Sequence, residues 1–427
     1  MRRHTATAYS RHGVTLTLGL TLLLAGAIGL LRTAPAAAAP ALVGDSKWAY
    51  PATYQGRHYV LFSQVQGSDL ALELAASADG ASWTVLDPLP GAGKAPNYPR
   101  LVVTPDGLHA AWADDAGDGG VYFATSGADP SDLAGWRVER IADRGKNVGL
   151  AATADGSLLV TWDDNASAWV RRRGPDAQWG EAANLDLPCG SPCLVTVGAQ
   201  PGGRAAVAFV DSGRNVVFTR FDAAGGWRRL DGGTRLSTAQ ANHWPQLATG
   251  PDGSAHVVWS QASGPGGAWE IQYARCDAAG RCSSPERVSR NLNGSLDRWP
   301  TVSVGADGVP SVAWQGDDAG PKGVYQIYAR TRGGDADPWP DYADPSAYCV
   351  SCAGGEDAEN PRYAAGSAEL AYTQRDAPGQ PWGIRYASGG SAAPVTTPGA
   401  APGDNGNAGD TGAPARVSAP APSPGEA

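Results

Sequence analysis

The sequence predicts an all-β protein built from seven similar four-stranded sheets around a common axis. The first observation is a repeat: HWPQLATGPDGSAHVVW at 243–259 and RWPTVSVGADGVPSVAW at 298–314 share seven of seventeen positions. The second is that each copy alternates like a pair of β-strands around a turn signal. The third is that Gly and Pro interrupt the chain after residue 40 too often for a sustained helical period. A strand-based repeat with a period of about 40 to 50 residues is typical of a β-propeller.

An aromatic residue closes the second predicted strand of every unit. These residues are Phe62, Trp112, Trp162, Phe209, Trp259, Trp314 and Tyr372, at intervals of 47 to 58 residues. A single four-stranded sheet cannot bury both of its faces, whereas radial stacking of seven sheets buries aromatic side chains between neighbours. We therefore expect these rings between the blades. The alternative is that they are exposed and stack on sugars.

The four strands of one blade are clearest in the sixth unit. The strand WPTVSVG leads to the dipeptide Asp307-Gly308, where glycine tolerates the positive φ of a hairpin turn. VPSVAWQ returns as the second strand, and Pro310 is compatible only with its start or with an unpaired position. A polar loop then leads to VYQIYARTR, the third strand, and a further turn leads to the fourth.

The propeller is expected to span residues 41–390, and its last blade needs an outer strand. ALVGDSKWAYP at 41–51 resembles the junctions before the fifth and sixth units, so the N-terminal segment is one donor. APVTTP at 393–398 is the other donor, and the sequence does not decide between them. Residues 391–427 are rich in Pro, Gly and Ala and have little apolar content, which predicts a disordered tail.

Residues 1–39 have the organisation of a signal peptide. A basic start precedes the apolar residues 14–31, and small residues follow. The apolar segment also just reaches the length of a membrane span, so a retained N-terminal anchor is the alternative to cleavage. We expect a secreted, extracellular or cell-surface protein. The excess of Arg over Lys, with abundant Ala and Gly, suggests a bacterial source.

The charge of the chain argues against two classes of partner. Its net charge is −9; without residues 1–39, which hold four Arg and no acidic residue, 29 basic residues stand against 42 acidic ones, a net charge of −13. Such a surface repels nucleic acid and anionic membranes. We therefore expect no nucleic-acid partner and no membrane insertion after signal cleavage. We also expect a monomer.

Six cysteines form three close pairs, Cys189/Cys193, Cys276/Cys282 and Cys349/Cys352. In an exported chain, an even number of closely spaced cysteines predicts structural disulfides. A zinc site would need two pairs to converge, but these pairs fall in the predicted blades four, five and seven, and CVSC lacks the βαβ context of a redox motif. Cys276 and Cys282 flank the turn between the third and fourth strands of the fifth blade, where other blades place a Trp such as Trp83.

The first blade carries Ser77-Ala78-Asp79-Gly80-Ala81-Ser82-Trp83 between its third and fourth strands. This segment resembles the Asp box of sialidase-like (BNR-repeat) propellers, Ser-x-Asp-x-Gly-x-x-Trp, shortened by one residue. The resemblance covers residues 41–390 and implies that Asp79 accepts hydrogen bonds in the turn while Trp83 packs into the blade. In catalytic members of that family, three Arg clamp a carboxylate, a Tyr with a Glu partner is the nucleophile and an Asp is the acid. These residues lie on the face opposite the Asp boxes.

That opposite face is formed by the loops that enter the first strand and leave the second strand of each blade. The entering loops carry Lys47, Asn97, Lys146, His243, Arg298 and Asn360, and the leaving loops carry Gln64, Asp114, Asp115, Asp163, Asp164, Gln261, Asp317, Asp318 and Asp376. We assign the ligand-binding face to Arg100, His243, Gln261, Arg298, Asp318 and Arg362, among which the three Arg could form a cationic cluster. Acids at 114–119 and 316–320 could chelate Ca²⁺, but they lack an ordered ligand spacing and are expected to be solvated, so no cofactor is assigned.

Two functions are compatible with these observations. The first is a non-catalytic binding module that recognises glycans or extracellular proteins through its polar face, because the scaffold is complete and no nucleophile and base are identified. The alternative is a divergent sialidase-like glycoside hydrolase, for which Asp114, Asp163 and Asp317 are the candidate acid and base. For the binding module, no residue is assigned as catalytic.

Overall fold

The computed structural model describes residues 45–394, apart from 117–118, 166, 224, 238–241, 263–266, 291–293, 320, 322, 353–356 and 389–390. The described part contains the strands β1 to β28 and two short 3₁₀ helices, η1 (Leu133–Gly135) and η2 (Pro345–Tyr348). None of its helices is long and apolar enough to cross a membrane. The expected signal peptide, residues 1–39, lies outside the described residues.

The strands form seven antiparallel sheets, one for each repeat of the sequence. Blade 1 consists of β1 (Ser46–Tyr54), β2 (Arg57–Gln66), β3 (Asp69–Ser77) and β4 (Trp83–Val85), and blade 2 of β5 (Pro96–Thr104), β6 (Gly107–Asp114), β7 (Gly120–Thr125) and β8 (Arg137–Ala142). Blade 3 consists of β9 (Lys146–Ala152), β10 (Leu158–Asp163), β11 (Ala168–Arg173) and β12 (Ala183–Asn184). Blade 4 consists of β13 (Thr196–Gln200), β14 (Arg204–Val210), β15 (Val216–Asp222) and β16 (Arg228–Arg229), with β17 (Thr234–Arg235) as a further partner of β15.

The remaining three blades follow the same plan with one exception. Blade 5 consists of β18 (Asn242–Thr249), β19 (Ala255–Ala262), β20 (Trp269–Cys276) and β21 (Glu286–Arg287), and blade 7 of β25 (Asp357–Tyr363), β26 (Leu370–Arg375), β27 (Gly383–Ser388) and β28 (Ser391–Pro394). Among the described residues, blade 6 has three strands, β22 (Arg298–Val304), β23 (Pro310–Gly316) and β24 (Gln326–Thr331). Residues 349–351 run along its outer edge instead of a fourth strand, and Val350 N donates to Ile327 O at 2.7 Å.

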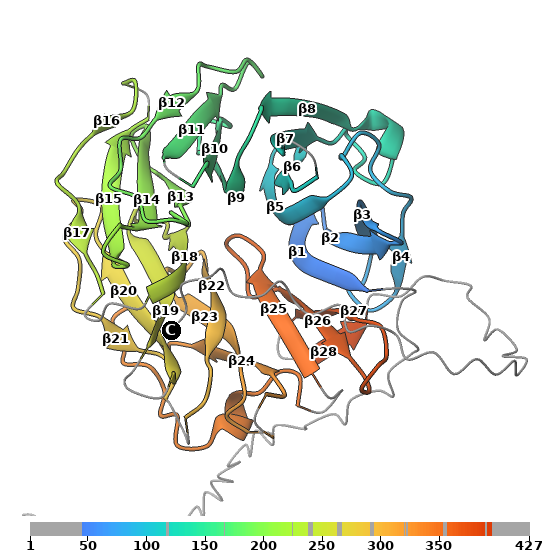
Figure 1. The fold of residues 1–427 in the computed structure, drawn as a ribbon, viewed down its shortest axis with the longest axis vertical. Helices are drawn as coiled ribbons and strands as arrows, with labels where there is room; N and C mark the ends of the chain where they lie inside the picture. The colour runs from blue at the N-terminus through green and yellow to red at the C-terminus, as the bar shows by residue number, and fades with distance from the viewer. Residues whose placement is uncertain are drawn as a thin grey trace, which may run out of the picture. The chain divides into compact units, whose positions relative to one another are not determined.

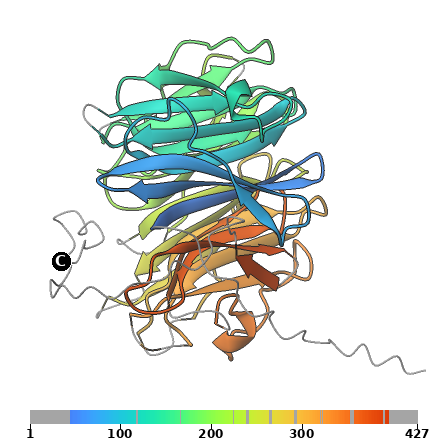
Figure 2. The ribbon, with the colours of Figure 1, turned by 90° about the vertical axis from the view of Figure 1, so that its right-hand side faces the viewer.

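The blades are arranged radially, with the first strand of each nearest the axis (Figure 1). These inner strands pack side by side in the order β1, β5, β9, β13, β18, β22 and β25, and β25 packs back against β1. Figure 2, a view at right angles, shows the sheets stacked face against face. The loops that enter each first strand and leave each second strand lie on one face, which we call the upper face. The hairpins after the first and third strands lie on the other, the lower face. The predicted seven-bladed propeller is confirmed.

The closing aromatic residues lie between the blades, as predicted. All seven are at most 3 % exposed. Trp314 of blade 6 packs with Val258 and Tyr273 of blade 5, and Phe62 of blade 1 packs with Tyr386 of blade 7. The burial of apolar rings between sheets therefore holds neighbouring blades together, and these rings are not available to stack on sugars.

The outer strand of blade 7 comes from the C-terminal side of the chain. β28 pairs with β27, so Ser391–Pro394, at the start of the expected tail, belongs to the propeller. The N-terminal side contributes two hydrogen bonds at the same blade: Ser46 N donates to Trp382 O at 3.0 Å, and Trp382 N donates to Asp45 Oδ1 at 3.1 Å. Of the two donors that the sequence left open, the C-terminal segment is the one that supplies the strand.

The turn between β3 and β4 has the local geometry implied by its sequence. Ala81 N and Ser82 N donate to Asp79 Oδ1 at 2.9 and 2.7 Å, and Gly80 N donates to Ser77 Oγ at 2.9 Å. The Trp83 ring is buried between blades 1 and 7. The segment therefore stabilises a hairpin on the lower face.

All three predicted disulfides are present, and no cysteine among the described residues is free. Each bond joins cysteines three to six positions apart; the pairs are Cys189–Cys193, Cys276–Cys282 and Cys349–Cys352. Every bond therefore clips a local turn rather than linking distant parts of the chain. Disulfides of this kind are typical of proteins outside the reducing cytosol.

One of the three pairs lies in another blade than the sequence predicted. Cys189 and Cys193 belong to blade 4, as predicted, because Gly190 N donates to Val210 O of β14 at 2.8 Å and Val210 N donates to Cys193 O at 2.8 Å. Cys193 is fully buried in the core shared by blades 3 and 4. The assignment of Cys349 and Cys352 to blade 7 was wrong, because Cys349 bridges Tyr328 of β24 at the outer edge of blade 6. Cys352 is exposed there, and its N donates to Cys349 Sγ at 3.1 Å. The misplacement arose because the segment after β24 replaces a regular fourth strand in blade 6.

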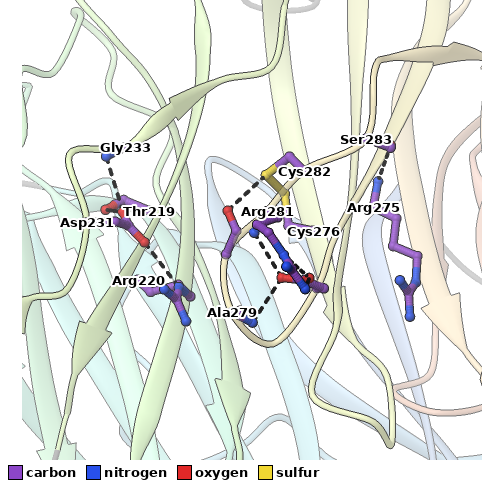
Figure 3. Close-up of a disulfide and its surroundings, with 12 residues drawn as sticks. Thr219, Arg220, Asp231, Gly233, Arg275, Cys276, Ala279, Arg281, Cys282 and Ser283 are labelled. Atoms are coloured by element: carbon purple, nitrogen blue, oxygen red, sulfur yellow. Dashed lines mark hydrogen bonds and ion pairs between the residues drawn. A yellow bond between two sulfur atoms is a disulfide. The ribbon is translucent and has the colours of Figure 1, made fainter.

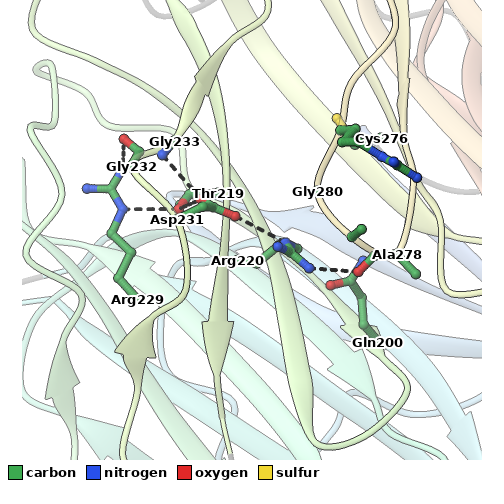
Figure 4. Close-up of polar contacts among 12 residues, drawn as sticks. Gln200, Thr219, Arg220, Arg229, Asp231, Gly232, Gly233, Cys276, Ala278 and Gly280 are labelled. Carbon is green, nitrogen blue, oxygen red and sulfur yellow. Dashed lines mark hydrogen bonds and ion pairs between the residues drawn. The ribbon is translucent and has the colours of Figure 1, made fainter.

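The bond between Cys276 and Cys282 closes the turn that follows β20, as predicted (Figure 3). Arg220 of blade 4 links this turn to its own blade: Arg220 Nη1 donates to Ala278 O at 2.7 Å and its Nε to Asp231 Oδ2 at 3.1 Å (Figure 4). The disulfide thus holds a hairpin on which a contact between blades 4 and 5 depends.

Candidate functional site at the propeller axis

One residue in each blade has left-handed backbone geometry at the upper end of the axis. These seven residues, which we call the axial ring, are Trp48, Tyr98, Asn147, Leu194, Trp244, Trp299 and Asn360, with φ between 48° and 56°. Residues other than glycine seldom adopt positive φ. In six blades the residue lies at a break in the pairing of the first and second strands, and in blade 4 it lies just before β13. A β-bulge of this kind redirects side chains.

Buried polar side chains from the ends of second strands hold parts of this backbone. Asp163 at the end of β10 accepts from Asn147 Nδ2 at 2.9 Å and from Leu194 N at 3.1 Å. Gln315 of β23 accepts from Asn360 N at 2.9 Å. The strained positions of Asn147, Leu194 and Asn360 are thus fixed by hydrogen bonds, two of which cross from one blade to the next.

The axial ring carries two aromatic pairs, each formed across a blade boundary. The rings of Trp48 and Tyr98 are 4.5 Å apart between centroids, and those of Trp244 and Trp299 are stacked at 4.4 Å. All four side chains are half-buried. They therefore present part of their faces to solvent while their other contacts fix their orientation.

A narrow pocket lies inside the axial ring. Its volume is about 70 Å³, and it is lined by Tyr98, Arg100, Asn147, Leu194, Val195, Trp244, Pro245, Gln246, Trp299, Pro300 and Arg362. A water molecule needs about 10 to 15 Å³ of such a cavity, so the pocket has space for several waters. It accommodates a carboxylate-sized group.

Arg100 and Arg362 meet on the ring of Tyr50. Their guanidinium carbons lie 4.8 and 5.5 Å from its centroid, and Arg362 Nε donates to Tyr50 Oη at 2.6 Å. Arg362 is 5 % exposed, and Arg100 Nη1 is buried without a hydrogen-bond partner among the described residues. Neither forms an ion pair in that part of the chain, whereas the buried Arg332 and Arg385 each pair with a carboxylate.

The electrostatics of this pair reflect the missing counterion. Burial, followed by the charge of Arg362, holds the pKa of Arg100 well below its usual value. Burial also lowers the pKa of Arg362 to about 10. Removing a cation from water without a partner costs several kcal/mol. The pocket is therefore a site that an anion would stabilise.

Two further predicted residues lie at the rim of the pocket. The Arg298 guanidinium is 6.0 Å from the Trp244 ring and 5.5 Å from the Trp269 ring, and its buried Nε has no hydrogen-bond partner in the described part of the chain. His243 contacts both Trp rings as well as Arg214. Burial, then the charges of Arg214 and Arg298, lowers the pKa of His243 to about 4, so this imidazole is neutral near pH 7.

The acids expected to be solvated or catalytic are instead anchors for the backbone. Asp114 accepts hydrogen bonds from Lys94 N, Ala95 N and Ala116 N at 2.9 to 3.0 Å. Asp317 accepts from Leu296 N at 2.9 Å and Gly323 N at 3.0 Å. Both side chains are buried, as is that of Asp163. These three residues belong to blades 2, 6 and 3, and each carboxylate is engaged by hydrogen bonds that fix the loops at the ends of the strands.

The other predicted residues do not join the pocket. Asp318 accepts a hydrogen bond from Tyr342 Oη at 2.9 Å in blade 6. Gln261, at the end of β19, pairs with Asn242 of β18. Among the residues that the structure describes, no group of three His, Cys, Asp or Glu side chains could hold a metal ion. The structure thus combines Arg100 and Arg362 in one pocket, with Arg298 and His243 at its rim.

Sequence reasoning missed the aromatic residues of the axial ring and also Glu359. Glu359 immediately precedes Asn360; burial, then the neighbouring Asp357, raises the pKa of its half-buried side chain to about 7. One signal was available, since Tyr98, Trp244, Trp299 and Asn360 each directly precede a proline at the start of a unit. The repeated residue-proline pair marked the bulge, but the sequence does not reveal its left-handed geometry.

Comparison with known proteins relates this chain to others through its fold. No protein-family model matches the sequence, and no curated protein matches it. A polysaccharide lyase of family PL25, an ulvan lyase solved bound to -[GlcA(1-4)Rha3S]-, has a similar structure, with a TM-score of 0.55 and 12% identity over 84% of this chain and 96% of that one. The propeller domain of the Trilobed protease from Pyrococcus furiosus has a TM-score of 0.47 and 10% identity over 82% of this chain and 98% of that one. At these identities, the likeness to the lyase concerns the fold alone.

Proposed function

We propose that this chain is a glycan-binding β-propeller that holds an acidic sugar at the upper end of its axis. The observation that carries the proposal is two aromatic pairs of the axial ring beside a pocket whose wall contains two guanidinium groups without a carboxylate partner among the described residues. Ligand sites commonly combine aromatic surfaces with a few well-placed polar groups. The apolar C–H face of a sugar ring can lie on indole, while a charged substituent reaches the pocket.

The strained backbone supports a binding role for the axial ring. Left-handed geometry at a residue other than glycine costs about 1 to 3 kcal/mol, and such strain persists where the surrounding structure imposes it, often at functional sites. Here it recurs in every blade and carries Trp48, Tyr98, Trp244 and Trp299. A purely structural ring would be served better by glycine.

The two arginines define the charge of the proposed ligand. A pocket of about 70 Å³ admits a carboxylate or a sulfate ester. The anion would supply the missing counterion of Arg100 and Arg362, in a protein whose net charge is −9. Guanidinium groups bind carboxylate and sulfate through charge-assisted hydrogen bonds. A glycan built from uronic acids or sulfated sugars fits both features of the site better than a protein surface does.

The comparisons and the disulfides guide the first experiments. The ulvan lyase, a propeller of similar fold, was solved with -[GlcA(1-4)Rha3S]-, which makes uronate-containing chains the first probes. The Asp79 turn supports a distant relation to sialidase-like propellers. Three disulfides and the signal-like residues 1–39 support export from a bacterial cell, where such polysaccharides are met.

The test is binding to acidic and neutral polysaccharides by affinity electrophoresis and calorimetry. We expect retention by polyuronates and none by an uncharged glucan. Trp299→Ala should weaken binding about tenfold, equivalent to about 1.4 kcal/mol. Trp227→Ala, a half-buried Trp in a hairpin of the lower face, is the matched control and should bind like the wild type. Equal loss in both variants, or no binding to any acidic glycan, would refute the proposal.

A divergent glycoside hydrolase is the second candidate, and Glu359 is the observation that favours it. A carboxylic acid whose pKa is raised to about 7 can donate a proton to a leaving group near neutral pH. Its position beside Asn360 places it next to the axial ring. Release of a fluorophore from aryl uronides, lost in Glu359→Gln and kept in the exposed-site control Glu181→Gln, would establish this activity. If the folded wild-type protein releases no fluorophore from any of these substrates, the hydrolase hypothesis is refuted and the binding function remains.

A further inference from the structure

A second pocket opens on the upper face between blades 2 and 3. Its volume is about 310 Å³, and its lining includes Asp115, Gly119, Arg144, Lys146 and Asn165. These residues come from the loops that leave β6 and β10 and from the segment that enters β9. At this size the pocket lies at the lower limit of small-ligand sites, which suits a single sugar unit. We call it the outer pocket.

Two chain segments connect the lining of the outer pocket with the axial ring. Lys146, in its lining, directly precedes Asn147 of the axial pocket. Asp115, also in its lining, accepts a hydrogen bond from the side chain of Asn97, which directly precedes Tyr98. Tyr98 and Asn147 line one pocket while their chain neighbours form or brace the other. A ligand that leaves the axial pocket between blades 2 and 3 would therefore reach the outer pocket.

The polar groups of the outer pocket differ from those of the axial pocket. Asp114 is largely occupied, because its two oxygens already accept three backbone N–H groups. Asp115 is bound at one oxygen by Asn97, and Arg144 and Lys146 form no ion pair within the described residues. All three side chains reach solvent. The lining also contains Asp164, whose carboxylate accepts hydrogen bonds from Ser167 N at 2.8 Å and Trp169 Nε1 at 3.1 Å. Asp115 together with the cationic Arg144 and Lys146, and with no aromatic ring in the lining, suits adjacent sugar hydroxyl groups rather than a stacked ring.

We propose that the outer pocket is a second sugar subsite, so that the protein recognises an extended acidic glycan rather than a single sugar. This inference rests on the proposed function, because the axial pocket supplies the first contact. One acidic sugar of the glycan lies at the axis, and a later sugar of the same glycan binds Asp115 and Lys146 by its hydroxyl groups. Once the first sugar is bound, the second contact is intramolecular and adds affinity without a second association step.

The test measures how affinity depends on oligomer length, by calorimetry with oligogalacturonides from the shortest that binds to long chains. We expect affinity to rise at least about tenfold along this series. Asp115→Ala should remove this gain and leave the shortest oligomer unaffected. The direction of the change in affinity for Asp115→Ala is diagnostic. Loss of a negative charge strengthens non-specific attraction to a polyanion, whereas loss of a specific hydrogen-bond acceptor weakens binding.

Two further variants complete the design. Lys146→Ala should also remove the gain with length, whereas Arg57→Ala, which deletes a cationic side chain at a lower-face hairpin, should not. Melting temperatures show that each variant is folded. Affinity independent of length, or tighter binding by Asp115→Ala, would overturn the second subsite while the Trp299→Ala result still supports the axial one. Failure of every oligomer to bind would overturn both.

Discussion

Replacement by alanine should have different effects at two tryptophans of blade 6: it should lower stability at Trp314 and weaken glycan binding at Trp299. Trp314 is 0 % exposed; its ring centroid lies 5.9 Å from that of Tyr328 and 5.7 Å from that of Tyr342. Trp314→Ala removes an entire ring from the interface of blades 5 and 6, which costs about 3 to 5 kcal/mol of unfolding free energy. Trp299 is half-buried and stacks on Trp244, and an aromatic pair contributes about 0.5 to 1.5 kcal/mol beyond area burial.

Thermal unfolding followed by circular dichroism separates the two effects. A loss of about 1 kcal/mol lowers the melting temperature by about 2 to 4 °C in domains of about 150 to 250 residues, so at the lower end of this scale Trp314→Ala should melt about 6 to 10 °C below the wild type. Trp299→Ala should melt within about 3 °C of it and bind glycan about tenfold more weakly, whereas folded Trp314→Ala should bind like the wild type. Equal melting temperatures for the two variants would contradict the assignment of one ring to packing and the other to the ligand.

Three other predictions follow from the described contacts. The double variant Cys276→Ser/Cys282→Ser should fold and bind glycan but lose about 2 kcal/mol of stability, measured by urea unfolding, because the closed loop is short and Arg220 still holds the hairpin; unchanged stability would refute this role. Burial, then Asp318, raises the pKa of Asp297, so its contribution to stability is fully present below about pH 4 and is lost as the pH rises through the raised pKa. Asp297→Asn should therefore flatten the fall in melting temperature toward alkaline pH, and a slope like that of the wild type would count against it. Finally, binding to polyuronates should weaken as salt rises, which a salt series in calorimetry would check.

Much of the fold was predictable because it is written in local, periodic signals. The closing aromatics, the Asp307-Gly308 turn and the pairing of the cysteines each depend on neighbours close in sequence, and each prediction is confirmed. The blade that carries Cys349 and Cys352 was not predictable, because an irregular segment replaces the fourth strand of blade 6. The outer strand of blade 7 was not predictable either, since both ends of the chain offered a suitable segment. Only the pairing of β28 with β27 decides between them.

The candidate site was less accessible to sequence reasoning, because its properties arise from burial and from contacts between blades. Arg100 and Arg362 were expected on the binding face, but their lack of a counterion among the described residues depends on which carboxylates lie near them in three dimensions. Trp244 and Trp299 occur in the same repeats as the packing tryptophans and have no distinguishing composition. Asp114 was expected to be a solvated acid, whereas it is buried and accepts hydrogen bonds from Lys94 N and Ala95 N, about twenty positions earlier in the sequence.

The central claim is that an acidic glycan binds at the upper end of the axis, with its charged group between Arg100 and Arg362. The most direct measurement is a crystal structure of the protein soaked with an oligogalacturonide. We predict a carboxylate within hydrogen-bond distance of both guanidinium groups and a sugar ring against Trp244 or Trp299. An oligosaccharide bound elsewhere on the surface, or an empty axial pocket under conditions in which calorimetry shows saturation, would contradict the claim.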